Sequence, residues 1–528
     1  MHFVRPLFGT NPTGGERIRV HKLLDPRLAL AVCQLEGRVP KSWGHVWLPV
    51  LVRTVEGKRL GSYSWLRERS TLGTVVSAFV EAGRLYDLAE LAEVRYVESG
   101  GEKLCTPEMI ASVKSSLFVI TDNSPRATCS GSPILAIIDD ALPYDDTCLY
   151  KDGVPAGRLI SAWDQSQTEK PVRGAVPYGV EYERNQLVGC EPSNDAWSLC
   201  RYGSHGAQVV RASTAQLPAE GDWDLLFVRT TGETAAIVDA LAYLHCKQRR
   251  LERPLVVNLS YGNHRGPHDG TSALEEALET FSGLGHLVVV SSGNVEPSLR
   301  HSHIRVEKGT DTRLPFSVTK QRQPNSNRSI VGIEVWGDRV PDGALTLESP
   351  DGHHYGPVAP KEARTWLSDS RNICLANCTS SPPNDAGEIL AIADFDSDDP
   401  GVTGEWRLHF TGITAKWDGD AWISDNIGCN ASLSARTQRS WSATSPATAR
   451  AVVAVGAELQ VSSEGDAFSK GLTRDGRRKP DLSVLGRVTA STSAAEVSGR
   501  IALLLARVPE LTTRDAIRVL REEFPSCK

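Results

Sequence analysis

The 528-residue sequence lacks an apolar run of about 18 residues, the shortest length that commonly crosses a membrane as a helix. It also lacks an excess of positive charge, because 58 lysine and arginine residues stand against 64 aspartate and glutamate residues, for a formal net charge of −6. Nucleic-acid-binding proteins usually carry a basic patch or stripe. We therefore expect no membrane-spanning segment and no nucleic-acid partner.

Paired cysteines are lacking as well. The 11 cysteines are an odd number, and the most closely spaced pair, Cys374 and Cys378, does not form a Cys-x-x-Cys motif. This pattern disfavours a disulfide framework and a zinc knuckle. The N-terminus has no charged start followed by an apolar run, so it does not resemble a signal peptide. A reducing, cytoplasmic setting is expected.

The length predicts several domains, since a single domain seldom exceeds about 300 residues. Apolar residues make up 40% and charged residues 23% of the chain, which is ordinary globular usage and argues against wholesale disorder. Four regions differ in patterning: an α+β region at 1–125, an α/β region at 126–299, a region of short alternating strands at 300–445, and a second α/β region at 446–528.

The two α/β regions together predict a doubly wound parallel sheet with helices on both faces. Strands are expected at 134–138, 225–228, 255–259, 287–290 and 451–456, and helices at 235–251, 272–284, 492–507 and 512–523. The region at 300–445 has the Pro-, Gly- and Asp-rich punctuation of an inserted antiparallel β module. Before the α/β fold, a strand at 74–80, a helix at 83–92 and a strand at 94–97 form a compact unit, and a linker follows at 121–125.

Three residues in these regions form a candidate catalytic set. Asp139 ends the first strand, where a side chain can emerge from the carboxyl edge of a parallel sheet. His205 is expected to open a helix, and Ser491 precedes a long apolar helix. A serine needs a base to become a nucleophile, and an imidazole base needs a carboxylate to orient it. Alone, each residue is an ordinary loop, turn or N-cap residue, so only the ordered combination points to catalysis.

On this ordered set the chain resembles the subtilisin-like serine peptidases, or subtilases, in which the order along the chain is Asp, His, Ser. The segments at 256–262, 288–294 and 468–482 are also similar to family segments. The resemblance implies that Ser491 attacks a peptide carbonyl, that His205 is general base and then acid, and that Asp139 orients the imidazole. No metal and no other cofactor is implied.

The resemblance also implies roles around this set. Asn294 and the backbone N–H of Ser491 would form the oxyanion hole, and a substrate in extended conformation would pair with Ser260, Tyr261 and Gly262. The chain is further similar to subtilases with a large, jelly-roll-like β insertion, including clostridial germination proteases. The unit at 74–98 is similar to a subtilase propeptide, so the N-terminal segment would act as an intramolecular inhibitor and be cut between about 105 and 132.

All three sites depart from the usual family motifs. The chain has Asp139-Asp140-Ala141, His205-Gly206-Ala207-Gln208 and Thr489-Ala490-Ser491 where subtilases usually have Asp-Ser/Thr-Gly, His-Gly-Thr-His and Gly-Thr-Ser. Two alternatives therefore stay open. Ser493 is a second candidate nucleophile, and the chain is alternatively a pseudoprotease that keeps the fold as a binding or regulatory scaffold. Because neighbouring carboxylates disfavour ionising together, Asp140 is expected to perturb Asp139.

Two further groups of residues contain side chains that can bind metal ions. The acidic run at 394–399 is interpreted as a solvated loop rather than a calcium site, and His301 and His303 as exposed loop residues.

Overall fold

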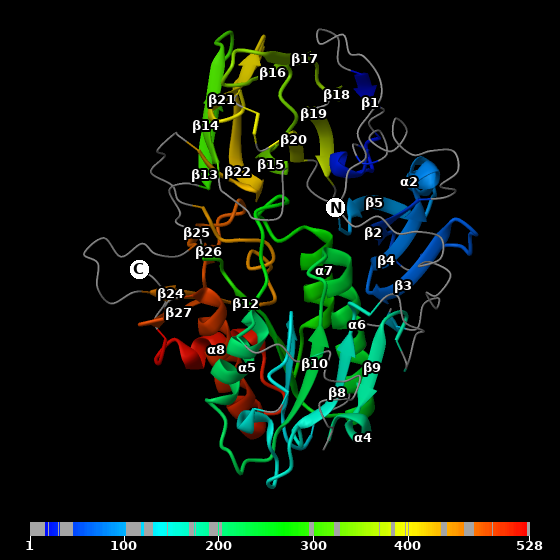
Figure 1. Cartoon of the computed structure of the whole chain (residues 1–528), viewed down its shortest axis with the longest axis vertical. Helices are drawn as coiled ribbons and strands as arrows, with labels where there is room; N and C mark the ends of the chain where they lie inside the picture. Colours follow the sequence, from blue (N-terminus) through cyan, green and yellow to red (C-terminus); the bar gives the residue numbers. More distant parts are fainter. Residues whose placement is uncertain are drawn as a thin grey trace.

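The computed structural model of the chain is shown in Figure 1. It describes residues 16–18, 21–29, 31, 46–56, 58–101, 118–120, 130–144, 146–167, 174, 176–188, 199, 203–294, 300–320, 328–368, 370–381, 386–396, 398–399, 401–433, 441–458, 469–487 and 489–524. The expected linker at 121–125 lies outside these residues.

An eight-stranded sheet forms the lower part of the molecule in Figure 1. Its strands are β7 (Ile134–Asp139), β8 (Leu159–Asp164), β9 (Val180–Glu183), β10 (Asp224–Arg229), β11 (Leu255–Leu259), β12 (His286–Ser291), β24 (Val453–Glu458) and β27 (Leu482–Leu485). Their order is β27-β24-β12-β11-β7-β10-β8-β9. All neighbours pair in parallel, except that β9 is antiparallel to β8.

Helices cover both faces of this sheet, which explains why its strands are apolar throughout. In β7, Leu135 and Ile137 pack into one core with α5 (His205–Thr214), α8 (Ala490–Arg507) and α9 (Thr513–Leu520). The alternate residues Ile134, Ala136 and Ile138 pack into a second core with α6 (Thr234–Leu251) and α7 (Ala273–Phe281). This arrangement confirms the predicted doubly wound parallel sheet. A short helix, α4 (Arg184–Leu187), follows β9.

The predicted strands and helices of this part are found, with shifted ends. The largest functional consequence is at α8, which begins at Ala490 rather than at residue 492, so that Ser491 lies in its first turn. Strands β8, β9 and β27 were not predicted. Two very short strands, β25 (Gly471–Leu472) and β26 (Arg478–Lys479), pair with each other before β27, and a 3-10 helix, η3 (Thr147–Leu149), follows β7.

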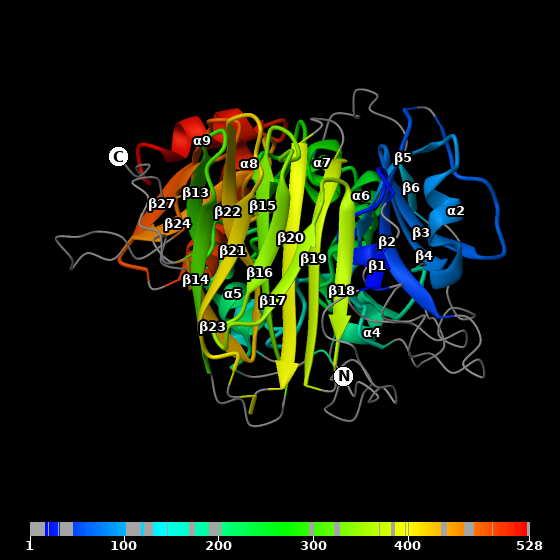
Figure 2. The same cartoon turned by 90° about the horizontal axis from the view of Figure 1, so that it is seen from above.

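The region between β12 and β24 is an antiparallel two-sheet module, at the top of Figure 1 and facing the viewer in Figure 2. Its strands are β13 (His301–Val306), β14 (Thr312–Lys320), β15 (Arg328–Gly337), β16 (Ala344–Glu348), β17 (His354–Val358), β18 (Glu362–Leu367), β19 (Arg371–Ser381), β20 (Ala386–Asp396), β21 (Gly404–Thr411), β22 (Trp417–Ile427) and β23 (Cys429–Leu433). One core lies between the sheets. The N-terminal strand β1 (Glu16–Ile18) pairs with β18 at the edge of this module.

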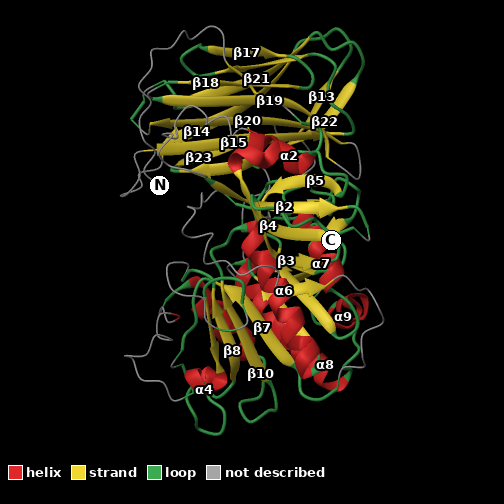
Figure 3. Ribbon diagram, turned by 90° about the vertical axis from the view of Figure 1, so that its right-hand side faces the viewer, coloured by secondary structure: helices red, strands yellow, loops and turns green. Residues whose placement is uncertain are grey.

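A five-stranded sheet lies between the module and the parallel sheet in Figure 3. Its order is β5-β2-β4-β3-β6, from β2 (Trp47–Thr54), β3 (Leu66–Leu72), β4 (Val75–Glu81), β5 (Val94–Ser99) and β6 (Phe118–Ile120). Between β4 and β5 lie η2 (Ala82–Arg84) and the short helix α2 (Leu85–Ala89). The predicted strand–helix–strand unit is present, and β2, β3 and β6 complete it.

This N-terminal sheet contacts α6 and α7 through buried polar groups. The Arg69 guanidinium lies 3.2 Å from the carboxylate of Asp239 on α6, and Asp239 also accepts a hydrogen bond from Ser70 Oγ. The Glu98 carboxylate accepts the backbone N–H of Ala273, the first residue of α7, at 2.9 Å. A carboxylate at a helix N-terminus satisfies a free donor and interacts favourably with the helix dipole. The N-terminal sheet is thus fastened to the helices on one face of the parallel sheet.

The loop between β11 and α7 joins the module to the parallel sheet. Gly266 N–H donates to Glu334 of β15 at 2.7 Å, and Arg265 Nε donates to Asp425 of β22 at 2.9 Å. Arg27, from the N-terminal segment, contacts both Glu334 and, at 2.9 Å, Asp425. Burial raises the pKa of Asp425, but Arg27 and Arg265 outweigh it and hold this pKa at about 2. This set of charged side chains therefore joins the N-terminal segment, the loop after β11 and the inserted module.

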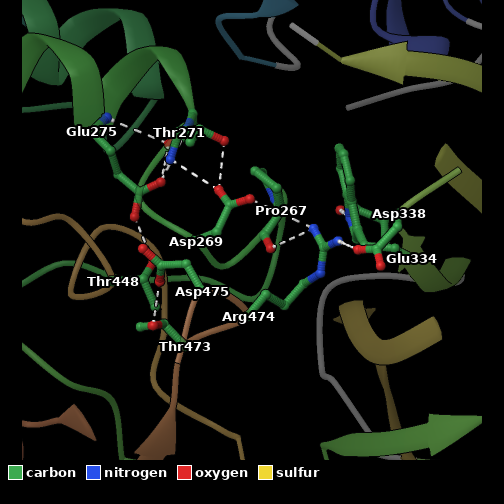
Figure 4. Close-up of polar contacts among 12 residues, drawn as sticks. Pro267, Asp269, Thr271, Glu275, Glu334, Asp338, Thr448, Thr473, Arg474 and Asp475 are labelled. Carbon is green, nitrogen blue, oxygen red and sulfur yellow. Dashed lines mark hydrogen bonds and ion pairs between the residues drawn. The ribbon is translucent and has the colours of Figure 1, made fainter. Parts of the chain in front are cut away.

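Arg474 fastens the same loop from another side (Figure 4). Its guanidinium donates to the carbonyl of Pro267 at 3.2 Å and lies 3.7 Å from the Asp269 carboxylate. At the end of the loop, Ser272 and Glu275 form a capping box at the start of α7, and Glu275 also accepts a hydrogen bond from Thr448. These contacts join the loop after β11 to Arg474 and the start of α7 to Thr448.

Helices α5 and α8 run side by side (Figure 1) and approach each other closely. A Cβ placed on Gly499 would lie 2.2 Å from the carbonyl oxygen of Ser213. Ser213 follows His205 by eight residues (213 − 205). Gly499 follows Ser491 by the same number (499 − 491). Since both helices begin at the carboxyl edge of the sheet, this contact brings their first turns to the same edge.

None of the described helices is long and apolar enough to cross a membrane.

Because the carbonyl of Ser213 occupies the place of a side chain at Gly499, we expect Gly499→Ala to lower the free energy of unfolding by about 2 kcal/mol. Thermal unfolding measures this as a lower Tm. Gly83→Ala is the matched control, because a Cβ there meets nothing within 4 Å. Equal Tm values for Gly499→Ala and the wild type would contradict the close approach of α5 and α8.

Candidate active site

The residues of the candidate catalytic set lie at the carboxyl edge of the parallel sheet. Asp139 is the last residue of β7, and Ser260 and Asn294 follow the ends of β11 and β12. These three strands are neighbours in the sheet. His205 is the first residue of α5, and Ser491 is the second residue of α8. Residues more than 350 positions apart are thus gathered along one edge.

Asp139 and His205 are in direct contact. His205 Nδ1 lies 2.9 Å from Oδ1 and 3.1 Å from Oδ2 of Asp139. The hydrogen bond that His205 donates to Asp139 raises the pKa of His205 above its usual value. Burial raises the pKa of Asp139, and the hydrogen bond from His205 offsets part of that effect. With Nδ1 donating to the carboxylate, Nε2 is left as the acceptor nitrogen of the ring.

The imidazole remains open to an approaching molecule, since 46% of the His205 side chain is exposed, while the Asp139 side chain is only 6% exposed. The charge of Asp140 raises the pKa of Asp139, but burial raises it more.

The first turn of α8 presents Ser491. Thr489 is the N-cap, in an extended conformation (φ −137°, ψ 145°), and its hydroxyl accepts the N–H of Thr492. This conformation suits threonine, so the absence of glycine at 489 does not disturb the turn. Ala490 N–H donates to the side-chain Oδ1 of Asn294 at 2.6 Å. Among the described residues, the N–H of Ser491 has no acceptor, so it is available at the positive end of the helix.

Ser491 and Ser493 differ in their surroundings. The Ser493 hydroxyl donates to the carbonyl of Thr489 at 3.0 Å, and the residue is fully buried. Ser491 is 5% exposed, and its carbonyl accepts a hydrogen bond from Ser260 Oγ at 3.2 Å. No hydrogen bond between described residues joins either serine hydroxyl to His205.

Ser260, Tyr261 and Gly262 leave the edge of the sheet directly after β11. The backbone groups of Ser260 and Gly262 make no hydrogen bond with another described residue, whereas the next residue, Asn263, pairs with Ser445 in an antiparallel bridge. Gly262 faces the Thr444 hydroxyl, which lies 2.4 Å from where a Cβ would be. The tight contact with Thr444 requires glycine at 262.

Two contacts at this edge were missed by the sequence analysis. The Ser260 hydroxyl bonds to the backbone of α8, and Thr444 packs against Gly262 and Gly293 as the chain returns from the module. No spacing or motif in the sequence relates these positions. The sequence does have a glycine in each of the two loops, Gly262 and Gly293. A glycine indicates that another group approaches the backbone closely, but it does not identify that group.

The interpretations of His301, His303 and the acidic run were wrong. His301 is 2% exposed in β13, and both histidines contact the carboxylate of Asp420, because an antiparallel partner strand lies beside them. The first part of the acidic run lies in β20 rather than in a loop, where Asp394 and Asp396 pair with Arg328. No group of three or more metal-binding side chains is found within the described part of the chain.

No protein-family model and no curated protein matches the chain. Solved structures do match. The chain has the fold of the subtilisin-like proteases, as the resemblance predicted.

In particular, it is similar to the Clostridium perfringens CspB protease, at 19% identity and a TM-score of 0.57, over 75% of this chain and 89% of that one. It also matches the Staphylococcus aureus epidermin leader peptide processing serine protease (12% identity, TM-score 0.36, 90% of this chain and 92% of that one). A cold adapted subtilisin-like serine proteinase matches at 12% identity and a TM-score of 0.28, over 76% and 86% of the two chains. The last two scores are too low to support an argument.

The contact between Asp139 and His205 predicts that the His205 imidazole titrates above its ordinary pKa of 6.5. Asp139→Asn removes the negative charge, so the pKa of His205 is expected to fall. NMR titration of the histidine side chains measures this change. Asp146→Asn is the matched control, because Asp146 bonds to Arg211 on the same helix without touching the imidazole. An unchanged His205 pKa in Asp139→Asn would contradict the contact.

Proposed function

We propose that the chain is a serine endopeptidase that hydrolyses peptide bonds through Asp139, His205 and Ser491. The observation that carries the proposal is the contact of Asp139 with His205 Nδ1, at 2.9 Å, at the sheet edge where α8 also begins. The subtilisin-like fold supports it. Asp139 then orients the ring, and the free Nε2 of His205 accepts the proton of the Ser491 hydroxyl as this oxygen attacks the carbonyl carbon.

The tetrahedral intermediate needs donors aimed at its oxyanion. We assign the backbone N–H of Ser491, which has no acceptor among the described residues, to this role, together with the side-chain amide of Asn294. The bond from Ala490 N–H to Asn294 Oδ1 supports the assignment, since it holds the amide beside the first turn of α8 and does not use the NH₂ group. As the C–N bond breaks, the His205 imidazolium gives its proton to the leaving amine. A water molecule, activated by His205 as base, then hydrolyses the acyl-enzyme and regenerates Ser491.

An extended peptide is the proposed substrate. The backbone groups of Ser260 and Gly262, which have no partner among the described residues, alternate along the chain as in the edge of a strand, and main-chain pairing there gives affinity with little choice of sequence. The N-terminal domain is proposed to act as an intramolecular inhibitor, supported by its docking on α6 and α7. Most of the expected cleavage range, 105–117 and 121–129, lies outside the described residues.

A second candidate function is a pseudoprotease that binds polypeptides without cutting them. It is favoured by one observation: among the described contacts, no hydrogen bond joins the Ser491 hydroxyl to His205. Catalytic hydrogen bonds are often long in the absence of substrate, so this observation does not displace the endopeptidase.

We expect a fluorophosphonate probe to label the wild-type protein, because the probe reacts with serines that a neighbouring base activates. Ser491→Ala should abolish labelling. Ser493→Ala is the matched control and should keep it, since the Ser493 hydroxyl bonds to its own helix. Labelling that persists in Ser491→Ala and is lost in Ser493→Ala would reassign the nucleophile. No labelling of the folded wild type would favour the pseudoprotease.

Self-processing is tested by intact-mass measurement after expression. The wild type is expected to have been cut between residues 105 and 132, and Ser491→Ala to keep its full mass, because the cut requires the nucleophile. The same full mass for both proteins would refute self-processing, and the same cut in both would assign it to another protease.

A further inference from the structure

Asp140, the residue after Asp139, contacts the helix that carries the imidazole. Its Oδ1 accepts the backbone N–H of Gly206 at 2.8 Å, and its own N–H donates to Asp139 Oδ1 at 2.8 Å. Gly206 directly follows His205. Two successive carboxylates therefore hold two successive residues of α5: Asp139 bonds to the side chain of His205, and Asp140 to the backbone of Gly206.

The packing around Gly206 leaves little freedom for this arrangement. A Cβ on Gly206 would lie 2.1 Å from the carbonyl oxygen of Ala141 and 3.0 Å from Asp140 Oδ1. The first turn of α5 thus lies directly on the loop after β7. The N-cap Ser204 accepts the N–H of Ala207 and leaves the N–H of Gly206 to Asp140. Asp140 is an exposed residue, so it is not required to fill a core.

We propose that Asp140 is a positioning residue for the peptidase reaction: by accepting the Gly206 N–H, its carboxylate fixes the first turn of α5 and so holds the His205 imidazole between Asp139 and the start of α8. This inference rests on the proposed function. It also gives a role to Asp140, which stands where the family motif usually has serine or threonine. Those side chains are shorter and carry no charge.

The charge of Asp140 supplies a readout that a merely structural contact would not have. Among the described residues, the ionisable groups acting on the imidazole are Asp139 and Asp140, both from the end of β7 and its loop, and each raises the pKa of His205. The first turn of α8, which faces α5, contains only alanine, serine and threonine. Removing the Asp140 charge therefore lowers the pKa of His205. Since the reaction needs the neutral imidazole, the acid limb of the rate profile moves to lower pH.

The experiment compares Asp140→Ala with Asp140→Asn by the rate of fluorophosphonate labelling over a range of pH. Asp140→Ala removes both acceptor and charge, so its plateau rate should fall by about 10-fold or more, as for other misplaced catalytic groups. Asp140→Asn restores an acceptor without the charge, so it should recover most of that rate with its acid limb at lower pH than the wild type. Asp146→Ala removes a contact to Arg211 farther along α5 and should change neither quantity.

Two outcomes would overturn the inference. One is a plateau labelling rate in Asp140→Ala equal to that of the wild type. The other is a plateau rate in Asp140→Asn as low as that of Asp140→Ala, with no shift of the acid limb. Equal Tm values for the variants exclude unfolding as the cause. If the wild type is not labelled at any pH, the proposed function fails, and NMR titration of His205 then decides the inference by itself. Asp140→Ala should lower the His205 pKa and weaken the Nδ1–H signal of the bond to Asp139; an unchanged titration and signal would refute the positioning role.

Discussion

The rest of the site depends on the contact between the first turn of α5 and the loop after β7. The carbonyl of Ala141 approaches Gly206 so closely that no side chain fits between them. This approach puts the His205 imidazole within hydrogen-bond distance of the buried Asp139 carboxylate and leaves 46% of the His205 side chain exposed. A buried carboxylate is costly unless it is paired. The contact with His205 therefore offsets the cost of burying Asp139 at this edge, and the same contact is the basis of the proposed chemistry.

The start of α8, which carries Ser491, is brought to the site by helix packing. Among the described residues, no hydrogen bond joins the Ser491 hydroxyl to His205. Helices α5 and α8 approach each other at Ser213 and Gly499, and both start at the carboxyl edge. Asn294 and Ser260 then fasten the first turn of α8 to the ends of β12 and β11 through Ala490 N–H and the Ser491 carbonyl. Ser491, the proposed nucleophile, is thus positioned by backbone contacts that do not use its own hydroxyl. Its N–H and hydroxyl make no hydrogen bond with another described residue.

The sequence was sufficient to predict the central strands of the parallel sheet, β7, β10, β11, β12 and β24, and the helices α6 to α9, because apolar runs covered on both faces are recognisable without a partner. It was not sufficient for β8, β9 and β27. It was also sufficient to place Asp139 at the end of a strand and His205 at the start of a helix. The contacts of Asp140 with Gly206 and of Ser260 with α8 could not be predicted, since they join residues 66 and 231 positions apart. The same holds for β1, whose partner β18 lies in the inserted module. Local pattern carries no information on such pairs.

The buried charges around Arg27 have a consequence for how this chain can vary. Arg27 and Arg265 neutralise Glu334 and Asp425, and these four residues come from the N-terminal segment, the loop after β11 and two strands of the module. Losing one member of a buried ion pair costs about 3–5 kcal/mol because its partner is left unpaired. Replacing any one of the three parts with a counterpart that lacks its member of this set would therefore leave a charge of another part unpaired. A chimera of this chain needs the matching residues at all three positions.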